Sequence, residues 1–450
     1  MRKILLFNAA SINSDSATGI TLRSILGKYD RDCLLDMCFF DSESVEGLDI
    51  EKLRLKWRRG SLGSILMGKN KSQLNQKLKS GESTVVRSRL KQMAVDLRQY
   101  IAIKAQNSGV SITQADMAVI KEFKPEVIYT LGSSVYTLKT AYKLSVMLNV
   151  PIILHFMDDW RHFLQWDNNK LLSGYKKKLE KYTKLCYSRS SVCIAISRSM
   201  ADAYSAETGI PHEAIMNSID TEAYYCGTRQ RGDSEFTIVY AGGLHLGREL
   251  ALKQIGEAVD TVILETGKKI RFDIYTSTDN IEKYGDCFSG CAHTQLKPAV
   301  RHENITDVYR TADLLVHVES DALIGSGFFK YSISTKIPEY LSTGRLMLFY
   351  GPENISLYKL LDGNKISAVA HDAVSLLSIL RKIVVGDFES GQIIDNAIRF
   401  AKEHFSAESA FEKFCSVINS AKLPDGRSTN RGAITPIMKE TAVSDSMRLI

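Results

Sequence analysis

The sequence predicts an α/β protein built from two successive parallel β-sheet units. Its 450 residues are sufficient for two or three domains of roughly 150 residues each. Short apolar runs alternate with helical patterns along most of the chain, which is typical of parallel strands covered by helices on both faces. This alternation stops in a polar, turn-rich stretch at residues 222–235 and then starts again. We therefore predict an N-terminal domain of residues 1–225 and a C-terminal domain of residues 226–400.

The first unit begins with the apolar run Ile4–Phe7, which leads through a polar loop into a helical pattern from Ile20 to Leu26. Continuous apolar runs, without an alternation of polar residues, are expected where a strand is buried on both faces. By this criterion we expect strands in the first unit at 3–8, 33–40, 127–131, 151–156 and 191–197.

The second unit repeats the same pattern. We expect its strands at 236–241, 270–275, 291–296, 314–319 and 346–350, and its helices at 249–265, 303–311 and 335–342. Two further helical patterns, near 391–404 and 407–420, close the fold, and we assign residues 401–422 to a C-terminal helix. Residues 423–450 lack periodicity and are predicted to form a disordered tail.

The composition excludes several classes of protein. Lys and Arg outnumber Asp and Glu by 58 to 51, a net charge of +7, and 44% of the residues are hydrophobic, which excludes whole-chain disorder and coiled-coil rods. No apolar run approaches the roughly 20 residues of a membrane-spanning helix, and Ile4–Phe7 is too short for a secretory signal. The eight cysteines are scattered, and His293 near Cys287 and Cys291 has no second partner at zinc-finger spacing. We expect reduced thiols, no metal site and a cytoplasmic location.

Residues 52–104 form a basic insert in the first unit. Fourteen Lys and Arg residues face only Glu82 and Asp96 in this stretch, and Trp57 and several leucines are interleaved with its first part. A basic, Trp-containing segment of this kind can bind an anionic membrane surface, here the inner face of the plasma membrane. The alternative is a solvated helical insert whose apolar stripe packs on the domain. A third interpretation, nucleic-acid binding, lacks a recognised motif and interleaved aromatic residues, so we expect no nucleic acid.

Ligands of parallel α/β sheets bind beyond the carboxyl ends of the strands, so the loops at those ends are the candidate sites. The first such loop contains Thr18 and Gly19. A glycine before a helix lets backbone N–H groups approach an anion or a sugar, although Thr18 could equally be an ordinary helix cap.

The second loop, residues 155–163, follows a predicted buried strand and is rich in polar side chains. His155 can donate a hydrogen bond to a hydroxylated ligand or accept one from it. Asp158 and Asp159 would point in different directions in an extended chain, so a coupled carboxylate pair is not expected. The alternatives are a strand-end histidine with internal partners and a helix cap with its ion pair. Together with Thr18 and Gly19, these three residues are the candidate ligand-binding residues of the first unit.

The third loop, residues 240–249, lies between a strand and a helix at the start of the second unit. Gly242 and Gly247 have the spacing of a phosphate-binding P-loop, but Arg248 stands where that motif needs Lys and Glu249 where it needs Ser or Thr. Two glycines, a helix N-terminus and an arginine nevertheless suit a diphosphate. The alternative is a tight turn with a solvent-facing arginine.

The fourth loop, residues 327–344, follows the predicted strand 314–319. Ser334 can cap a helix that contains Lys336 and Glu339, which are three residues apart and share one face. A carboxylate there can accept two hydrogen bonds from a ribose diol, while Lys336 or Lys330 neutralises phosphate charge. An internal ion pair between Lys336 and Glu339 is the alternative interpretation.

These segments together resemble the retaining GT-B glycosyltransferases of the group 1, or family 4, type. The resemblance is carried by YAGGLHLGRE at 240–249, STKIPEYLSTGRLMLFYGP at 334–352 and ISRSMADAYSAETGIPHEAIMNSID at 196–220, and it extends over most of residues 1–420. It implies two Rossmann-like domains with an interdomain cleft and C-terminal helices that close the fold.

The resemblance also implies roles for individual residues. Gly242 and Gly243 would lie against the diphosphate of a nucleotide-sugar donor, and Arg248 occupies the position of a phosphate-neutralising lysine. The family's usual arginine position is Gly243 here. Glu339 matches the second Glu of the family's E-x7-E motif, which holds the ribose, whereas Tyr331 replaces the first. His155 matches a histidine that faces the donor sugar. The predicted catalytic residues are therefore His155, Arg248 and Glu339, and the donor-binding residues also include Gly242, Gly243, Lys330, Ser334 and Lys336.

By this resemblance the chain is expected to be a cytoplasmic, peripherally membrane-associated enzyme. It would transfer a sugar from a nucleotide sugar to a glycan or lipid-linked glycan in cell-surface polysaccharide synthesis, with retained configuration. The predicted acceptor-binding residues are Thr18, Gly19, His155, Asp158 and Asp159. The nucleotide sugar is a substrate, and no cofactor or divalent metal is expected, because cations and backbone dipoles would stabilise the leaving group. The alternatives are a nucleotide-sugar 2-epimerase on the same fold and a non-catalytic partner subunit that binds a sugar nucleotide or glycan.

Overall fold

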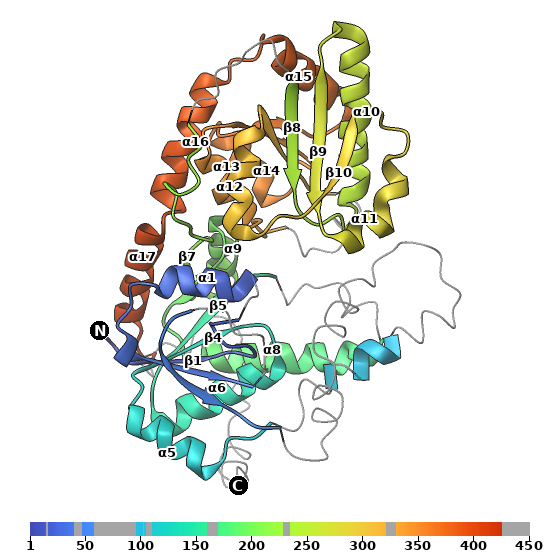
Figure 1. Ribbon diagram of the computed structural model, residues 1–450. Coiled ribbons are helices and arrows are strands. Elements are labelled where there is room, and N and C mark those ends of the chain that lie inside the picture. Colours follow the sequence, from blue (N-terminus) through green and yellow to red (C-terminus); the bar gives the residue numbers. More distant parts are fainter. Residues whose placement is uncertain are drawn as a thin grey trace. The chain divides into compact units, whose positions relative to one another are not determined.

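The computed structural model describes residues 1–14, 17–39, 47–57, 96–101, 103–104, 110–159, 170–227, 235–320 and 330–424 (Figure 1). The chain divides into two compact units. The first contains Met1–Met216 and the C-terminal part of the chain from Ala410 onward, and the second contains Asn217–Ser409. Most of the predicted basic insert 52–104 and the predicted tail from residue 425 onward lie outside the described residues.

The first unit contains a seven-stranded sheet in the order β3-β2-β1-β4-β5-β6-β7, and every neighbouring pair is parallel. The central strands are apolar and buried on both faces, as their unbroken apolar runs predicted. The strands are β1 (Ile4–Phe7), β2 (Leu34–Cys38), β3 (Glu51–Arg54), β4 (Val127–Leu131), β5 (Ile152–Phe156), β6 (Cys193–Ala195) and β7 (His212–Ala214).

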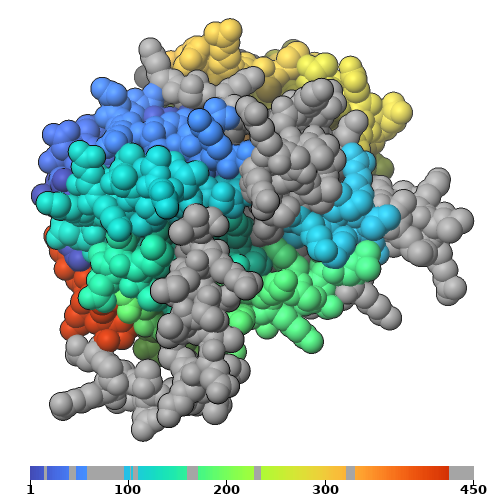
Figure 2. Space-filling model, turned by 90° about the horizontal axis from the view of Figure 1, so that it is seen from below, coloured from blue at the N-terminus to red at the C-terminus, as the bar shows by residue number. Residues whose placement is uncertain are grey.

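Several helices of this unit begin at capping residues that the sequence supplies. Thr113 and Asp116 form a capping box at the start of α5, and Ser134 accepts from the backbone N–H of Thr137 at the start of α6. Figure 2 shows a face of this unit that residues of α5, α6 and α8 help to form. The helices are α1 (Ala17–Leu26), α5 (Gln114–Phe123), α6 (Val135–Leu148), α8 (Ser173–Tyr187), α9 (Arg198–Thr208) and α17 (Ala407–Ser420), with short 3-10 turns η1 (Arg31–Cys33) and η3 (Lys170–Leu172).

The C-terminal helix α17 packs on one face of the first sheet beside α1. Its residues Phe414 and Ile418 share a buried core with Tyr129 of β4. The guanidinium of Arg2 donates to the carbonyl oxygens of Ile418 and Ala421, each at 2.7 Å, and so satisfies carbonyls that the helix end leaves free. These contacts explain why the end of the chain belongs to the first unit.

The second unit contains a six-stranded, fully parallel sheet in the order β10-β9-β8-β11-β12-β13. The apolar faces of α10 and α15 cover one side of it. Its strands are β8 (Phe236–Ala241), β9 (Ile270–Thr276), β10 (Thr294–Pro298), β11 (Leu314–Val318), β12 (Leu346–Tyr350) and β13 (Ala368–Ala370). Its helices are α10 (Arg248–Thr266), α11 (Thr278–Tyr284), α12 (Ile305–Thr311), α13 (Lys336–Ser342), α14 (Ser356–Gly363), α15 (Ala373–Val385) and α16 (Gly391–His404), with 3-10 turns η4 (Gly285–Phe288) and η5 (His302–Asn304).

The units divide after Met216, whereas we placed the domain boundary after residue 225. The reason is a set of contacts that fixes the intervening segment to the second unit. The side-chain amide of Asn217 donates to the carbonyl of Ile333 at 3.3 Å, and the backbone N–H of Ile219 donates to the carbonyl of Phe405 at 2.9 Å. These contacts are long-range in sequence, so a composition shift alone does not reveal them.

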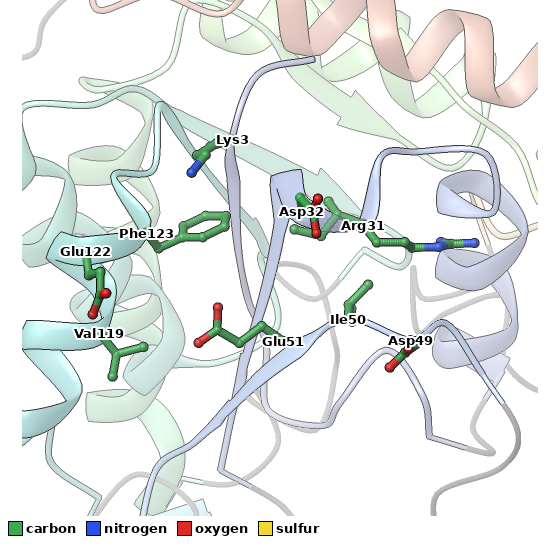
Figure 3. Close-up of a pocket in the computed structure, with 10 residues that line it drawn as sticks. Lys3, Arg31, Asp32, Asp49, Ile50, Glu51, Val119, Glu122 and Phe123 are labelled. Atoms are coloured by element: carbon green, nitrogen blue, oxygen red, sulfur yellow. The ribbon is translucent and has the colours of Figure 1, made fainter.

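In the part of the chain that the structure describes, none of the helices combines the length and apolar character that a bilayer-spanning segment requires. A cavity of about 550 Å³ lies in the first unit, at the amino ends of β1, β2 and β3. Lys3, Arg31, Glu51 and Glu122 are among its lining residues (Figure 3). Because ligands of parallel sheets bind at the opposite, carboxyl ends, this cavity is not the candidate site.

Candidate functional site

The candidate donor site of the second unit lies where β8 and β11 end. These two strands are parallel neighbours, with Leu314 opposite Ile238, so the loops that follow them emerge at the same edge of the sheet. The loop after β8 carries Gly242 and Gly243 and leads to Arg248, and Glu319 comes directly after β11.

Arg248 is the first residue of α10 and forms an ion pair with Glu319. The loop reaches it through two left-handed residues, Leu246 at φ 67° and Gly247 at φ 79°. Arg248 Nη2 lies 2.8 Å from Glu319 Oε1, and the two side chains are only 12% and 10% exposed. Burial alone would lower the pKa of Arg248, but the Glu319 carboxylate outweighs burial and raises it. Burial likewise opposes ionisation of Glu319, yet Arg248 and His317 hold its pKa down at about 2. Both members of the pair are therefore charged at neutral pH.

Lys336 adds a second cation to the same cluster. A Cβ atom on Gly242 would lie 2.5 Å from Lys336 Nζ, so the ammonium group covers the glycine backbone. Burial and the positive charge of Arg248 lower the pKa of Lys336 to about 8, against the opposing influence of Glu339 and Glu319. Lys336 thus lies within electrostatic range of all three charged groups.

Glu339 lies one turn further along α13 and is 7% exposed. Its Oε2 accepts a hydrogen bond from the hydroxyl of Tyr309 at 2.6 Å. Burial raises the pKa of Glu339, and the Tyr309 hydroxyl, His302 and Lys336 oppose this rise. No ion pair with Lys336 is formed within the described ranges, so the alternative interpretation of this helix does not apply.

The remaining predicted donor-binding residues lie around this cluster. Gly243 accepts a hydrogen bond from the Tyr240 hydroxyl at 2.8 Å through its carbonyl oxygen. Ser334 precedes α13, and its hydroxyl oxygen accepts from the N–H of Lys336 at 3.4 Å. Lys330 is exposed, and its Nζ lies 5.0 Å from the centre of the Tyr331 ring. The structure therefore brings Gly242, Arg248 and Lys336 together, whereas Lys330 forms no hydrogen bond or ion pair with them in the described part of the chain.

In the first unit, Thr18 and Gly19 lie in the first turn of α1. A Cβ atom on Gly19 would be 2.2 Å from the carbonyl oxygen of Ser14, so glycine is needed for the turn after β1 to pack on the helix. The Arg23 guanidinium holds the same turn by donating to the carbonyls of Ile12 and Ser14, each at 2.7 Å.

His155, near the end of β5, is 1% exposed. Its Nδ1 shares a 2.6 Å hydrogen bond with the Tyr129 hydroxyl, and its Nε2 is buried without a partner in the described structure. Burial lowers the pKa of His155 to about 3, so the ring is neutral. Asp159 is also buried and accepts from the Tyr204 hydroxyl at 2.5 Å, whereas Asp158 is half-buried. The role of these residues in acceptor binding stays a prediction.

Two carboxylates that the sequence analysis did not select are part of these loops. Glu319 pairs with Arg248, and Asp36 of β2 accepts from the Ser11 hydroxyl at 2.6 Å and from the N–H of Ile12 at 3.2 Å. The available signal was the same for both, because each acid stands inside or directly after an apolar strand, in LLDMC and LLVHVE. A buried acid in such a position needs a partner.

The cluster in the second unit is suited to an anion that carries two charges. It provides a guanidinium, an ammonium group, half-buried glycine backbone and the start of a 19-residue helix. Nearby, Glu339 can accept hydrogen bonds from a diol. Among the described residues, no three His, Cys, Asp or Glu side chains gather in a way that could hold a metal ion.

No protein-family model and no curated protein sequence matches the chain. Solved structures do match it over nearly its full length. HepE from Anabaena, crystallised with UDP, is 13% identical with a TM-score of 0.62, and the match covers 93% of this chain and 100% of HepE.

Two other matches have similar extent. Sucrose-phosphate synthase from Thermosynechococcus elongatus is 11% identical with a TM-score of 0.57, covering 93% of this chain and 98% of that one. A glycosyltransferase from Rickettsia africae is 10% identical with a TM-score of 0.55, covering 92% and 97%. At such low identity these matches show the fold alone. The fold is that of the GT-B glycosyltransferases, as the sequence predicted.

Proposed function

We propose that this protein is a glycosyltransferase that transfers a sugar from a nucleoside-diphosphate sugar to an acceptor. The observation that carries the proposal is the convergence of Arg248, Lys336 and Gly242 at the carboxyl ends of β8 and β11. In a GT-B fold this edge of the second unit is suited to a diphosphate. The three matching HepE structures contain UDP, UDP with glucose, and UDP-glucose, which supports a uridine nucleotide as the first donor to test.

In the proposed reaction the bond between the sugar C1 and the diphosphate oxygen breaks, and the acceptor oxygen bonds to C1. The acceptor's proton passes to the leaving phosphate oxygen on the same face of the sugar, so configuration is retained. Arg248 and Lys336 stabilise the charge that develops on the leaving diphosphate, and we propose that they make a divalent metal unnecessary. The carboxylate of Glu339 accepts hydrogen bonds from the hydroxyl groups of the ribose.

The acceptor is proposed to be a glycan or lipid-linked glycan in cell-surface polysaccharide synthesis. We propose that it binds the first unit near Thr18, Gly19, His155, Asp158 and Asp159, and that the basic segment 52–104 brings the enzyme to an anionic membrane surface. The support for this part is the family resemblance and the excess of basic residues.

A transfer assay tests the proposal. The purified protein is incubated with UDP-glucose and with GDP-, ADP- and dTDP-sugars, in the presence of EDTA, with and without an acceptor glycan. We expect an acceptor-dependent release of nucleoside diphosphate from one donor. An epimer formed from the donor alone would indicate the 2-epimerase instead, and donor binding without any turnover would indicate the non-catalytic partner subunit.

A further inference from the structure

Glu319 is held rigidly at the end of β11. Its backbone N–H donates to the carbonyl of Tyr350 at 3.1 Å, which continues the pairing of β11 with β12 by one residue. A Cβ atom on Gly351 would lie 2.8 Å from the carbonyl oxygen of Glu319, so the neighbouring chain packs closely against it. The Glu319 carboxylate therefore starts from a fixed backbone position.

The carboxylate contacts one particular edge of the Arg248 guanidinium. Arg248 Nε donates to Oε2 at 3.3 Å, and Nη2 donates to Oε1 at 2.8 Å and to Oε2 at 3.0 Å. A guanidinium has five N–H donors in a planar fork, and Glu319 uses those of the Nε–Nη2 edge. Within the described ranges Nη1 makes no hydrogen bond, so its two N–H groups are available to another acceptor.

His317 fixes the carboxylate from the other side. Its Nε2 lies 3.2 Å from Glu319 Oε1, and its ring stacks on Phe349 at a centroid distance of 6.2 Å. Burial lowers the pKa of His317, so the ring is neutral. Because Glu319 is ionised and can only accept, the proton must be on Nε2. The bare Nδ1 is the ring nitrogen that is buried without a partner in the described structure.

We infer that Glu319 is the positioning residue for Arg248. Its carboxylate accepts hydrogen bonds from Nε and Nη2, which leaves Nη1 free to donate to the diphosphate of the donor. His317 donates to the same carboxylate and keeps it in that orientation. This inference rests on the proposed function, because it assigns Glu319 to the same donor site. The rival explanation is that Glu319 occupies the anion position itself and must be displaced by the diphosphate. The two explanations predict opposite effects of removing its charge.

The test measures the dissociation constant of UDP by isothermal titration calorimetry for the wild type and three variants. They are Glu319→Gln, Arg248→Met and the double variant. If Glu319 acts through Arg248, Glu319→Gln weakens UDP binding about tenfold, by misorienting the guanidinium. In the Arg248→Met background the same substitution produces no weakening, because no guanidinium remains to be positioned.

The other outcomes overturn the inference. Tighter binding of UDP by Glu319→Gln shows that Glu319 competes with the diphosphate. Equal weakening in both backgrounds shows a general effect on the fold, and unchanged binding shows no role at all. If Glu319→Gln does not fold, as judged by its melting transition, His317→Phe replaces it and is expected to weaken UDP binding in the same direction but less.

A negative result for the proposed function is recognised separately. If UDP, GDP, ADP and dTDP all fail to bind the wild-type protein, then the second unit is not a nucleotide site, and the role of Glu319 is refuted with it. If the wild type binds UDP and the Glu319 variants bind it with the same affinity, only the positioning role of Glu319 is refuted.

Discussion

The ammonium group of Lys336 covers the backbone of Gly242, where a Cβ atom would be only 2.5 Å from Nζ. The same Cβ atom would lie 2.7 Å from the Tyr240 hydroxyl, which itself donates to the carbonyl of Gly243. A side chain at residue 242 would therefore force the Lys336 ammonium group or the Tyr240 hydroxyl to move. This contact brings the second cation of the site beside the loop that leads to Arg248.

Gly242→Ala is expected to displace Lys336 and to weaken UDP binding about tenfold or more. The displaced ammonium group no longer contacts the diphosphate, whereas β8 and β11 keep their structure. Calorimetric titration with UDP measures the effect. Gly363→Ala is the matched control, because no atom beyond its chain neighbours and its own helix backbone lies within 4 Å of the Cβ position there. Equal UDP affinities for the two alanine variants would argue against a diphosphate at Gly242.

The affinity for UDP is expected to fall as the pH rises above about 8. The free protein loses the Lys336 proton near that pH, because burial and Arg248 lower its pKa to about 8. A bound diphosphate favours the charged form of Lys336, so above this pH the protein takes up a proton when UDP binds. The affinity for UDP therefore falls by up to about tenfold for each further pH unit. Below it Lys336 is already charged, and the affinity stays constant.

Titrations between pH 7 and 9 measure this dependence, because the terminal phosphate of UDP ionises near pH 6 and is fully charged in that range. Lys336→Met keeps an unbranched side chain that is one atom shorter and removes the titrating group. Its UDP affinity should be lower at pH 7 and should not decline further. A variant that retains the wild-type slope would show that another group is responsible.

Glu339→Gln is expected to remove the preference for ribose over 2′-deoxyribose. A carboxylate can accept hydrogen bonds from both ribose hydroxyls, and a hydrogen bond to a charged group contributes about 1.5–3 kcal/mol. We therefore expect UDP affinity to fall about tenfold or more, and the affinity for 2′-deoxy-UDP, which keeps only one of the two hydroxyls, to fall less. Tyr309→Phe is the control, because it removes the hydroxyl that donates to Glu339 but keeps the carboxylate. Equal losses for both nucleotides would contradict ribose recognition by Glu339.

The stability of the first unit is expected to depend on the ionisation of Asp36. Burial raises the pKa of Asp36 to about 6, although Ser11, Ile12 and Lys52 oppose the rise. The native state therefore holds this proton more tightly than the unfolded state. The corresponding stability is fully present below the unfolded-state pKa, near 4, and is lost as the pH rises to about 6. Two pKa units correspond to roughly 3 kcal/mol.

Chemical denaturation at several pH values from 3.5 to 7.5 measures this effect. The free energy of unfolding of the wild type, relative to Asp36→Asn, should decrease over the pH window from about 4 to 6. Ser11→Ala keeps the carboxyl group and removes a donor that lowers its pKa, so it should retain the loss and extend it to higher pH. A difference between wild type and Asp36→Asn that does not vary with pH would refute the account of Asp36.

Most of the fold could be predicted from the sequence because its central strands are unbroken apolar runs. The predicted strands 127–131, 236–241 and 346–350 agree with β4, β8 and β12, and the predicted helices 391–404 and 407–420 agree with α16 and α17. Of the four edge strands in the described sheets, β10 overlaps the predicted strand 291–296, whereas β3, β7 and β13 escaped prediction. Residues 52–54 were assigned to the basic insert but belong to β3, whose exposed, charged sequence EKLR pairs on one side only. Such a strand forms because it pairs with a neighbouring strand, and its own sequence lacks the apolar run that would predict it.

The candidate site was predicted in part. Glycines and cations mark phosphate-binding loops by their local spacing, so Gly242, Arg248 and Lys336 could be selected. Glu319 could not be assigned, because its partner is 71 residues away and the adjacency of β8 and β11 brings them together. The partners of Glu339 and His155 were missed for the same reason, since Tyr309 and Tyr129 come from other elements.

The central claim is that the second unit holds a nucleoside diphosphate through Arg248. The most direct measurement is the thermal stability of the wild type and of Arg248→Met, in EDTA, with and without UDP, GDP, ADP and dTDP. We predict that one nucleotide stabilises the wild type by about 2.7 kcal/mol when it is present at about a hundred times its dissociation constant, and that Arg248→Met loses most of this stabilisation. If no nucleotide stabilises the wild type, or if Arg248→Met responds equally, the account is contradicted.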